Sequence, residues 1–204
     1  MKSFFIQAVL FDFDGTLTKP GALDFSVIKQ TVGCPPDQPV LEFIEGLPDT
    51  VQQKRARSIL EQFEISAAMN AEPNPGAEDL ILYLRSNNLR IGIISRNSLQ
   101  CIQQSLKNFK NIGQADFDLI ISRDEPVKPK PSGDGLLLAA TKMMVDISRL
   151  LMVGDYVFDV QSGKNAGAIT VFLDNRPESQ SKTIESDYTI SELKEIKKIV
   201  RLRH

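Results

Sequence analysis

The sequence predicts an α/β protein with a mostly parallel sheet, helices on both faces of that sheet, and a small helical insertion after the first strand. Two observations predict the sheet: short apolar segments alternate with segments of helical periodicity, and the first apolar segment ends abruptly at two acids and a glycine. A third predicts the insertion, because a long helical stretch without a strong strand separates the first apolar segment from the second. The 204 residues suffice for one sizeable core and a small second unit.

The first strand is predicted in the apolar run over residues 4–11. This run stops at Asp12 and Asp14, and Gly15 follows at once. Charge at the end of a buried strand is costly unless something compensates it. In open α/β sheets, the carboxyl ends of the strands form the edge where ligands bind. Two acids at that edge, opening into a glycine turn, therefore indicate a site for a hard cation and a ligand.

The insertion is predicted over residues 20–74, so that the core consists of residues 1–19 and 75–204. Within it, helical periodicity predicts three helices, over residues 25–32, 40–45 and 49–69. A cluster of prolines and a glycine at residues 72–76 marks its end.

Helices and strands alternate in the rest of the chain. Helices are predicted over residues 77–87, 99–108, 132–144 and 157–165, and strands over residues 90–95, 117–121, 150–153 and 168–173. Short apolar strands joined by helices predict parallel neighbours with right-handed crossovers. Residues 176–186 are predicted to form a polar surface loop, residues 188–190 a last short strand, and residues 194–203 a packed helix with a basic solvent face.

Composition restricts the function classes. A formal net charge of −2 offers no basic footprint for nucleic acid or for an anionic membrane surface. No apolar segment is long enough to span a bilayer and no signal-peptide pattern is present, so a cytoplasmic location is expected. Cys34 and Cys101 lack metal or redox spacing and are expected to be idle thiols. His204 is the only histidine, which argues against a Ser-His-Asp triad or a His-ligated zinc site.

Further polar residues follow the other predicted strands. In a parallel sheet these strand ends point one way, so we expect their side chains to meet along one edge. Taken singly, Ser95 is also typical of a helix cap and Lys128 of a solvent-exposed charge. The residues predicted to converge are Asp12, Asp14, Ser95, Lys128, Asp155 and Asp159.

Such a constellation suits phosphate chemistry. Carboxylates within about 4 Å of one another repel by roughly 1–4 kcal/mol per pair, and a bound Mg²⁺ would remove that conflict. A phosphate dianion would supply the opposite charge for Lys128 and would accept hydrogen bonds from Ser95. Gly15 allows the turn to bring backbone amides close to a phosphoryl group. Hydrolysis through an aspartyl-phosphate is a known route for this chemistry.

The order of these elements resembles that of the haloacid dehalogenase-like hydrolase superfamily, which has a Rossmann-like core. The matching segments are Asp12-Phe13-Asp14-Gly15-Thr16, Ser95, Lys128 and Gly154-Asp155 with Asp159. The fragment Lys128-Pro129-Lys130-Pro131 resembles the Lys-Pro-x-Pro of the phosphoglycolate phosphatase and β-phosphoglucomutase branch. By that match Lys128, not Lys130, is the motif lysine, and the insertion is the helical cap of that branch.

The resemblance implies a role for each matching acid. Asp12 is expected to be the nucleophile and a Mg²⁺ ligand. Asp14 is expected to be the general acid–base, with its backbone carbonyl on the metal. Asp155 is expected to bind the metal, and Asp159 to support the metal's waters or Lys128. The namesake dehalogenases lack an acid at the position of Asp14, so its presence indicates phosphoryl chemistry.

The resemblance also implies contacts to the substrate. Ser95 and Lys128 are expected to hold the phosphoryl oxygens, together with Gly15 and Thr16. Arg96 and Asn97 stand where family members often carry an aspartate, asparagine or serine, and are expected to contact the rest of the substrate. The alternative for Arg96 is that it lies in solvent.

The favoured function is a Mg²⁺-dependent phosphatase that hydrolyses a small soluble phosphomonoester through an aspartyl-phosphate, with neither nucleic acid nor membrane as a partner. The nearest alternative is a phosphomutase on the same fold, acting on a sugar phosphate. A signalling receiver domain also uses strand-end aspartates, Mg²⁺, a hydroxyl and a lysine. A catalytically inactive scaffold that binds a protein through the insertion is the remaining alternative.

Overall fold

The computed structural model describes residues 5–175 and 184–200. Its sheet has six strands, all parallel, in the order β3-β2-β1-β4-β5-β6. The predicted parallel sheet, including its short last strand, is therefore confirmed. The strands are β1 (Ala8–Phe11), β2 (Arg90–Ile94), β3 (Leu119–Ile121), β4 (Leu150–Gly154), β5 (Ile169–Leu173) and β6 (Tyr188–Ile190).

The central position of β1 decides where the polar residues meet. Every residue of β1 and of β4 is buried, as expected for strands covered on both faces. Phe11 is in register with Ile93 of β2 on one side and with Val153 of β4 on the other. The residues that come directly after these three strands therefore stand next to one another at one edge.

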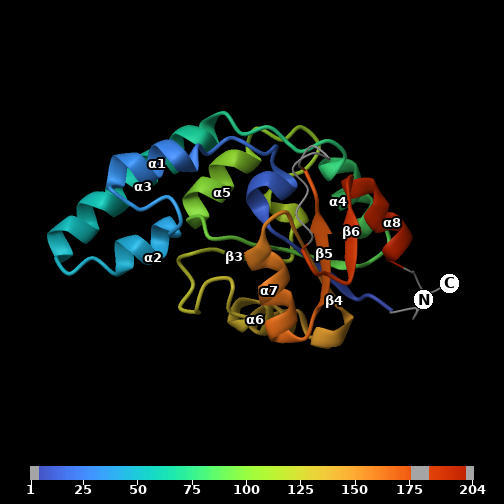
Figure 1. Ribbon diagram of the computed structural model, residues 1–204. Helices are drawn as coiled ribbons and strands as arrows, with labels where there is room; N and C mark the ends of the chain where they lie inside the picture. The colour runs from blue at the N-terminus through green and yellow to red at the C-terminus, as the bar shows by residue number, and fades with distance from the viewer. Residues whose placement is uncertain (1–4, 176–183, 201–204) are drawn as a thin grey trace.

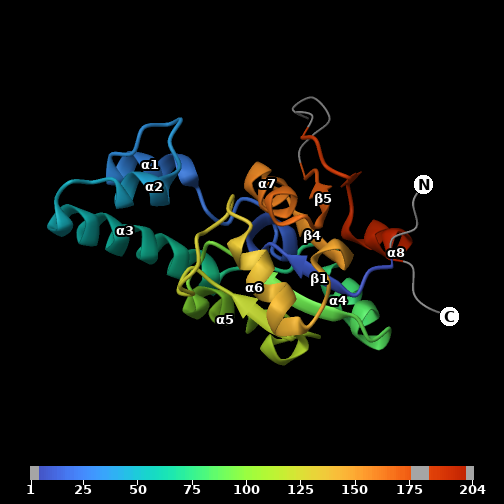
Figure 2. The same ribbon diagram turned by 90° about the horizontal axis from the view of Figure 1, so that it is seen from below.

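Helices cover both faces of the sheet (Figures 1 and 2). On one face, α4 (Ala77–Ser86), α5 (Leu99–Leu106) and α8 (Ile196–Ile199) share a core with the apolar side chains of β1 and β2. On the other face, α6 (Asp134–Met143) and α7 (Val157–Ala166) pack on the alternate side chains of β1 and β4. Because successive side chains of a strand point to opposite faces, the sheet has one apolar core on each face.

The helices of the insertion, called the cap below, lie together at one end of the molecule (Figure 1). They are α1 (Phe25–Val32), α2 (Val40–Glu45) and α3 (Thr50–Met69). They bury a small apolar core of their own. The Asp24 carboxylate begins α1 by accepting hydrogen bonds from the backbone N–H groups of Ser26 and Val27, and the left-handed Gly33 ends it.

Two segments side by side connect cap and core. Thr18 forms an antiparallel bridge with Pro73, and the backbone N–H of Asn74 donates to the Leu17 carbonyl oxygen at 2.8 Å. The long helix α3 continues from the cap to the core, where it packs on α5. The side chain of Asn108 fixes its end by donating to the carbonyl oxygens of Ala68 and Ala71. The division at residues 20–74 stays a prediction, although all three cap helices lie inside it.

Most element boundaries fall close to the predicted ones. The first strand begins at Ala8 rather than at residue 4, and residues 1–4 lie outside the described part. Strand β3 begins two residues late, because a short 3₁₀ turn over Gln114–Asp116 ends at Phe117. The C-terminal helix, predicted over residues 194–203, spans Ile196–Ile199 and follows a 3₁₀ turn, and residues 201–203 lie outside the described part.

Residues 176–183 of the predicted loop and His204 lie outside the described residues. In the described part of the chain, no helix combines the length and the apolar character needed to cross a membrane. Cys34 and Cys101 are both free and buried.

Candidate active site

A tight turn over Phe13–Leu17 carries the chain out of β1. Gly15 has φ +77°, and a Cβ at this position would lie 2.2 Å from Asp155 Oδ2, so no larger residue fits there. The hydroxyl of Thr16 donates to Asp155 Oδ1 at 3.3 Å. The turn thus brings the first acidic segment of the sequence into contact with the last.

Three carboxylates form a compact cluster at this edge of the sheet. Asp12, Asp155 and Asp159 each offer an oxygen, and these oxygens lie within 4.8 Å of one another. Asp12 follows β1, and Asp155 and Asp159 follow β4, so the sheet register holds them together. Asp14, also predicted as a ligand, has its carboxylate outside this cluster, and a metal contact through its backbone carbonyl stays a prediction. Hard oxygen ligands in this number fit Mg²⁺.

The structure brings Lys130, rather than the predicted Lys128, to the acid cluster. Lys130 is only 5% exposed, and its Nζ lies 2.5 Å from Asp12 Oδ1 and 2.6 Å from Asp159 Oδ1. It also donates to the Ile94 carbonyl oxygen at 3.1 Å. Lys128, which the sequence motif favoured, is exposed. A buried ammonium needs such partners, and Lys130 is the one of the two that has them. Both lysines precede a proline, so the fragment alone does not separate them.

Burial and crowding raise the pKa values of the acids. Burial raises the pKa of Asp14 to about 8, and the charges of Asp12 and Glu64 add to this rise. Burial and the charge of Asp12 also raise the pKa of Asp155 to about 7 and that of Asp159 to about 6.

The pKa of Lys130 is raised as well. Burial would lower the pKa of Lys130, but its contacts with Asp12 and Asp159 outweigh burial and raise that pKa. These contacts do not return the pKa values of Asp155 and Asp159 to their ordinary 3.8, so a divalent cation would complete the charge balance.

The segment after β2 meets the first acidic segment. Ser95 is buried, lines the pocket beside Asp12, and accepts a hydrogen bond from the backbone N–H of Asn97 at 3.1 Å. The side chain of Asn97, predicted to contact substrate, donates to Asp14 Oδ2 at 2.6 Å. Asn97 therefore holds the carboxyl group of the expected general acid.

Arg96 links the core to the cap instead of lying free in solvent. Its Nη2 lies 2.6 and 2.7 Å from the two carboxylate oxygens of Glu42 in α2. Its guanidinium also lies over the ring of Phe158, 5.2 Å from the ring centroid. Among the described residues, Arg96 Nε is the buried side-chain nitrogen without a hydrogen-bond partner.

Sequence reasoning missed a second link between cap and core. Glu64 of α3 accepts hydrogen bonds from Arg123 at both oxygens, at 2.7 and 2.9 Å. The backbone N–H of Arg123 donates to the Asn97 carbonyl oxygen, and its Nη1 donates to that of Arg96. A signal was present: Glu64 lies one helical turn after Leu60, on the buried face of α3.

Two asparagines that secure the turn were also missed. Asn74 donates to the carbonyl oxygens of Gly15 and Thr16, and Asn175 donates to the same Gly15 oxygen. Asn175 also lies 3.5 Å from Asp155 Oδ2. Because Asn175 follows β5 by two residues, the strand-end argument that found the acids applies to it equally well.

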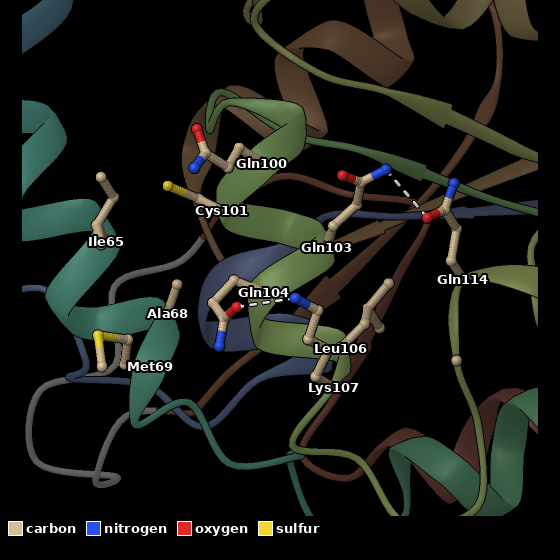
Figure 3. A pocket seen from close by; sticks show the side chains of 11 residues that line it. Ile65, Ala68, Met69, Gln100, Cys101, Gln103, Gln104, Leu106, Lys107 and Gln114 are labelled. Carbon is tan, nitrogen blue, oxygen red and sulfur yellow. Dashed lines mark hydrogen bonds between the residues drawn. The ribbon is translucent and has the colours of Figure 1, made fainter.

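Two hollows lined by described residues are large enough to hold a small molecule. One of about 370 Å³ lies between cap and core, with the acid cluster, Ser95 and Lys130 on its core side. The other, about 610 Å³, lies between α3 and α5 (Figure 3). Glutamine and apolar side chains line this larger hollow together with Lys107, and Gln103 donates a hydrogen bond to Gln114 at 3.0 Å. Its lining contains no carboxylate, so the smaller hollow, called the pocket below, is the candidate active site.

Fold and site together define an α/β enzyme with a capped, acidic strand-end site. The family model of haloacid dehalogenase-like hydrolases matches residues 9–173, and the chain belongs to this family. It is a hydrolase, which argues against the receiver and scaffold alternatives.

The chain is similar to other hydrolases in sequence and in fold. An uncharacterized hydrolase of Saccharomyces cerevisiae is 35% identical over 83% of this chain and 78% of its own length. An N-acetylmuramic acid 6-phosphate phosphatase of Pseudomonas aeruginosa is 27% identical over 83% of this chain and 82% of its own. A putative haloacid dehalogenase-like hydrolase of Bacteroides fragilis shares the fold, with a TM-score of 0.77 at 23% identity, over 94% of this chain and 99% of its own.

Proposed function

We propose that this protein is a Mg²⁺-dependent phosphatase that hydrolyses small phosphomonoesters through a phosphorylated Asp12. The main observation in support is that Asp12 lines the pocket, contacts Lys130 and clusters with Asp155 and Asp159. The Pseudomonas relative that is named as a phosphatase supports the same activity. A divalent cation held by Asp12 and Asp155 would offset the negative charge between nucleophile and phosphoryl group.

In the first step, the Asp12 carboxylate attacks phosphorus, and the bond from phosphorus to the leaving alcohol breaks. Asp14 gives its proton to the departing oxygen, and its raised pKa of about 8 keeps that proton in place near neutral pH. Lys130 and Ser95 hold the phosphoryl oxygens, because both line the pocket and Lys130 contacts the nucleophile Asp12. Asn97 keeps the Asp14 carboxyl group oriented toward the reacting centre.

In the second step, Asp14 has become a carboxylate and accepts a proton from water. The water oxygen bonds to phosphorus, the bond from Asp12 to phosphorus breaks, and inorganic phosphate leaves. Asp12 is again a carboxylate and Asp14 is again protonated. A phosphomutase would instead return the phosphoryl group to a sugar, so net release of phosphate separates the two functions.

The test compares Asp12→Asn with Asp79→Asn, a matched change at an exposed aspartate. With an aryl phosphate and Mg²⁺, Asp12→Asn should lower kcat by about 10⁴-fold or more, because the nucleophile is lost. Asp79→Asn should change kcat less than about twofold. A chelator should abolish turnover by the unaltered protein.

Acid quenching during turnover of radiolabelled substrate should leave a hydroxylamine-sensitive phosphate on the unaltered protein and none on Asp12→Asn. Turnover retained by Asp12→Asn would refute the nucleophile. Turnover that persists in the chelator would refute the metal dependence.

A further inference from the structure

The cap side of the pocket is lined mainly by apolar side chains. The cap contributes Leu23, Phe25, Pro39, Val40, Leu41 and Leu60 to it. At the core rim, Tyr156 and Phe158 begin α7 and face the same space. The acids, the lysine and Ser95 occupy the other side, so the leaving group of a bound ester would extend toward this apolar wall.

Two of the apolar rings are unusually exposed. Phe25 is 53% exposed and Tyr156 is 58% exposed, although both line the pocket. Tyr156 stands edge-on to Phe158, with ring centroids 5.1 Å apart and an angle of 79° between the ring planes. Covering exposed rings with an apolar ligand is favourable, and a further ring can extend such an edge-to-face arrangement.

The charged side chains around this wall contact other protein groups, although Arg96 Nε is buried without a hydrogen-bond partner among the described residues. Both carboxylate oxygens of Glu64 accept hydrogen bonds from Arg123, and Arg96 Nη2 donates to Glu42. Lys29 donates through Nζ to the Pro36 carbonyl oxygen at 2.5 Å. A substrate hydroxyl or carboxylate that displaced one of these contacts would leave a protein group without its partner, and a polar group that is desolvated without a partner is costly.

The volume sets the size of the leaving group. About 370 Å³ is near the lower end of small-molecule sites, for which roughly 300–1,000 Å³ is typical. Part of this space must hold the phosphoryl group beside Asp12 and Lys130. The remainder suits one ring system rather than a dinucleotide.

We propose, on the basis of the proposed phosphatase activity, that the pocket selects phosphomonoesters of apolar, ring-bearing alcohols over those of sugars or hydroxy acids. Phe25 and Tyr156 are the specificity-determining residues, because they offer exposed rings from opposite sides of the pocket. The cap side contributes Phe25 through α1, and the core side contributes Tyr156 just before α7.

The experiment measures kcat/KM for esters of primary alcohols, so that leaving-group reactivity is similar. Phenethyl phosphate should exceed glycerol phosphate, glucose 6-phosphate and phosphoglycolate by at least about 10-fold, as contacts in an apolar pocket commonly achieve. Tyr156→Ala and Phe25→Ala should each lower kcat/KM for phenethyl phosphate by about 10-fold. The same variants should change kcat/KM for ethyl phosphate less than about twofold.

Met144→Ala, at an exposed apolar residue outside the pocket lining, is the matched control and should alter neither value. A preference for the sugar or hydroxy-acid ester would overturn the proposal, as would ring variants that affect both esters equally. Calorimetric binding to Asp12→Asn gives the same ranking without turnover. If phenethyl phosphate binds no more tightly than glycerol phosphate there, the selectivity is refuted independently of the phosphatase activity.

Discussion

The two walls of the pocket are built in opposite ways. On the core wall, Asp12, Ser95 and Asp155 come directly after buried parallel strands, and hydrogen bonds in the sheet fix their relative positions. On the cap wall, Phe25 and Val40 come from two short helices, and α2 meets the core through the ion pair of Glu42 with Arg96. Backbone geometry positions the reactive groups, whereas side-chain packing and ion pairs position the apolar ones.

This difference separates chemistry from selectivity. A wall fixed by strand register keeps its reactive groups in place while the opposite wall varies. A wall made of separate helices tolerates changes in helix position and side-chain size, because no strand ladder crosses it. Substitutions of the strand-end residues on the core wall should therefore affect all phosphate esters. Substitutions on the cap wall, or of Tyr156 at the core rim, should affect some esters more than others.

The largest effect is expected from the buried lysine of the core wall. Lys130→Met removes the partner of Asp12 and Asp159 and a donor to the phosphoryl group, so kcat/KM should fall by about 10³-fold for every ester. Lys128→Met, at an exposed lysine two residues away, should change kcat/KM less than about twofold.

Circular dichroism shows whether Lys130→Met is folded. If it is not, Lys130→Arg keeps the charge but not the compact ammonium, and should still lose most of the activity. Equal losses for Lys128→Met and Lys130→Met would contradict the assignment of Lys130.

The contrast between the walls also explains what the sequence predicts. Periodicity and punctuation place all six strands, because buried parallel strands are short apolar runs. The strand-end rule then predicts the meeting of Asp12, Ser95 and Asp155 without any side-chain information. Asn175 lies within reach of the same rule, since it follows β5.

Sequence does not resolve the contacts that depend on a loop or on helix placement. The choice between Lys128 and Lys130 depends on the path of a proline-rich loop, and residue type is the same at both positions. The partnership of Glu64 with Arg123 joins residues 59 positions apart, on a cap helix and a core loop. Periodicity places Glu64 on the buried face of α3 but does not say which core residue it meets.

The second effect concerns the two ion pairs that join the walls. The Glu64 and Arg123 side chains are 4% and 11% exposed, whereas those of Glu42 and Arg96 are 42% and 20% exposed. Arg123→Leu leaves a buried carboxylate without its partner and should lower the free energy of unfolding by about 3–5 kcal/mol. Glu42→Gln should lower it by about 1 kcal/mol or less, because exposed pairs contribute little.

Urea denaturation measures both values. A double variant, Glu64→Leu with Arg123→Leu, removes both charges and should recover much of the stability lost in Arg123→Leu. If Arg123→Leu costs no more than Glu42→Gln, the buried pair does not anchor the cap.

The smallest effect concerns stability and metal binding at the core wall. The pKa values of about 7 for Asp155 and about 6 for Asp159 are raised from an ordinary 3.8, so the folded protein binds more protons than the unfolded chain between these limits. The stability of the metal-free protein should therefore fall as pH rises from about 4 to about 7. Mg²⁺ at this cluster would require deprotonated carboxylates, so its stabilising effect should grow over the same range.

At ten times its Kd, Mg²⁺ should stabilise the protein by about 1.4 kcal/mol, which raises Tm by about 3–6 °C. Thermal denaturation at pH 6 and pH 8, with NaCl at matched ionic strength as the control, measures this difference. Asp155→Asn should remove most of the Mg²⁺ effect, because it removes one of the three clustered carboxylates. A Tm shift that is equal at both pH values, or larger at pH 6, would show that Mg²⁺ does not bind these carboxylates. The charge balance of the core wall would then depend on Lys130 alone.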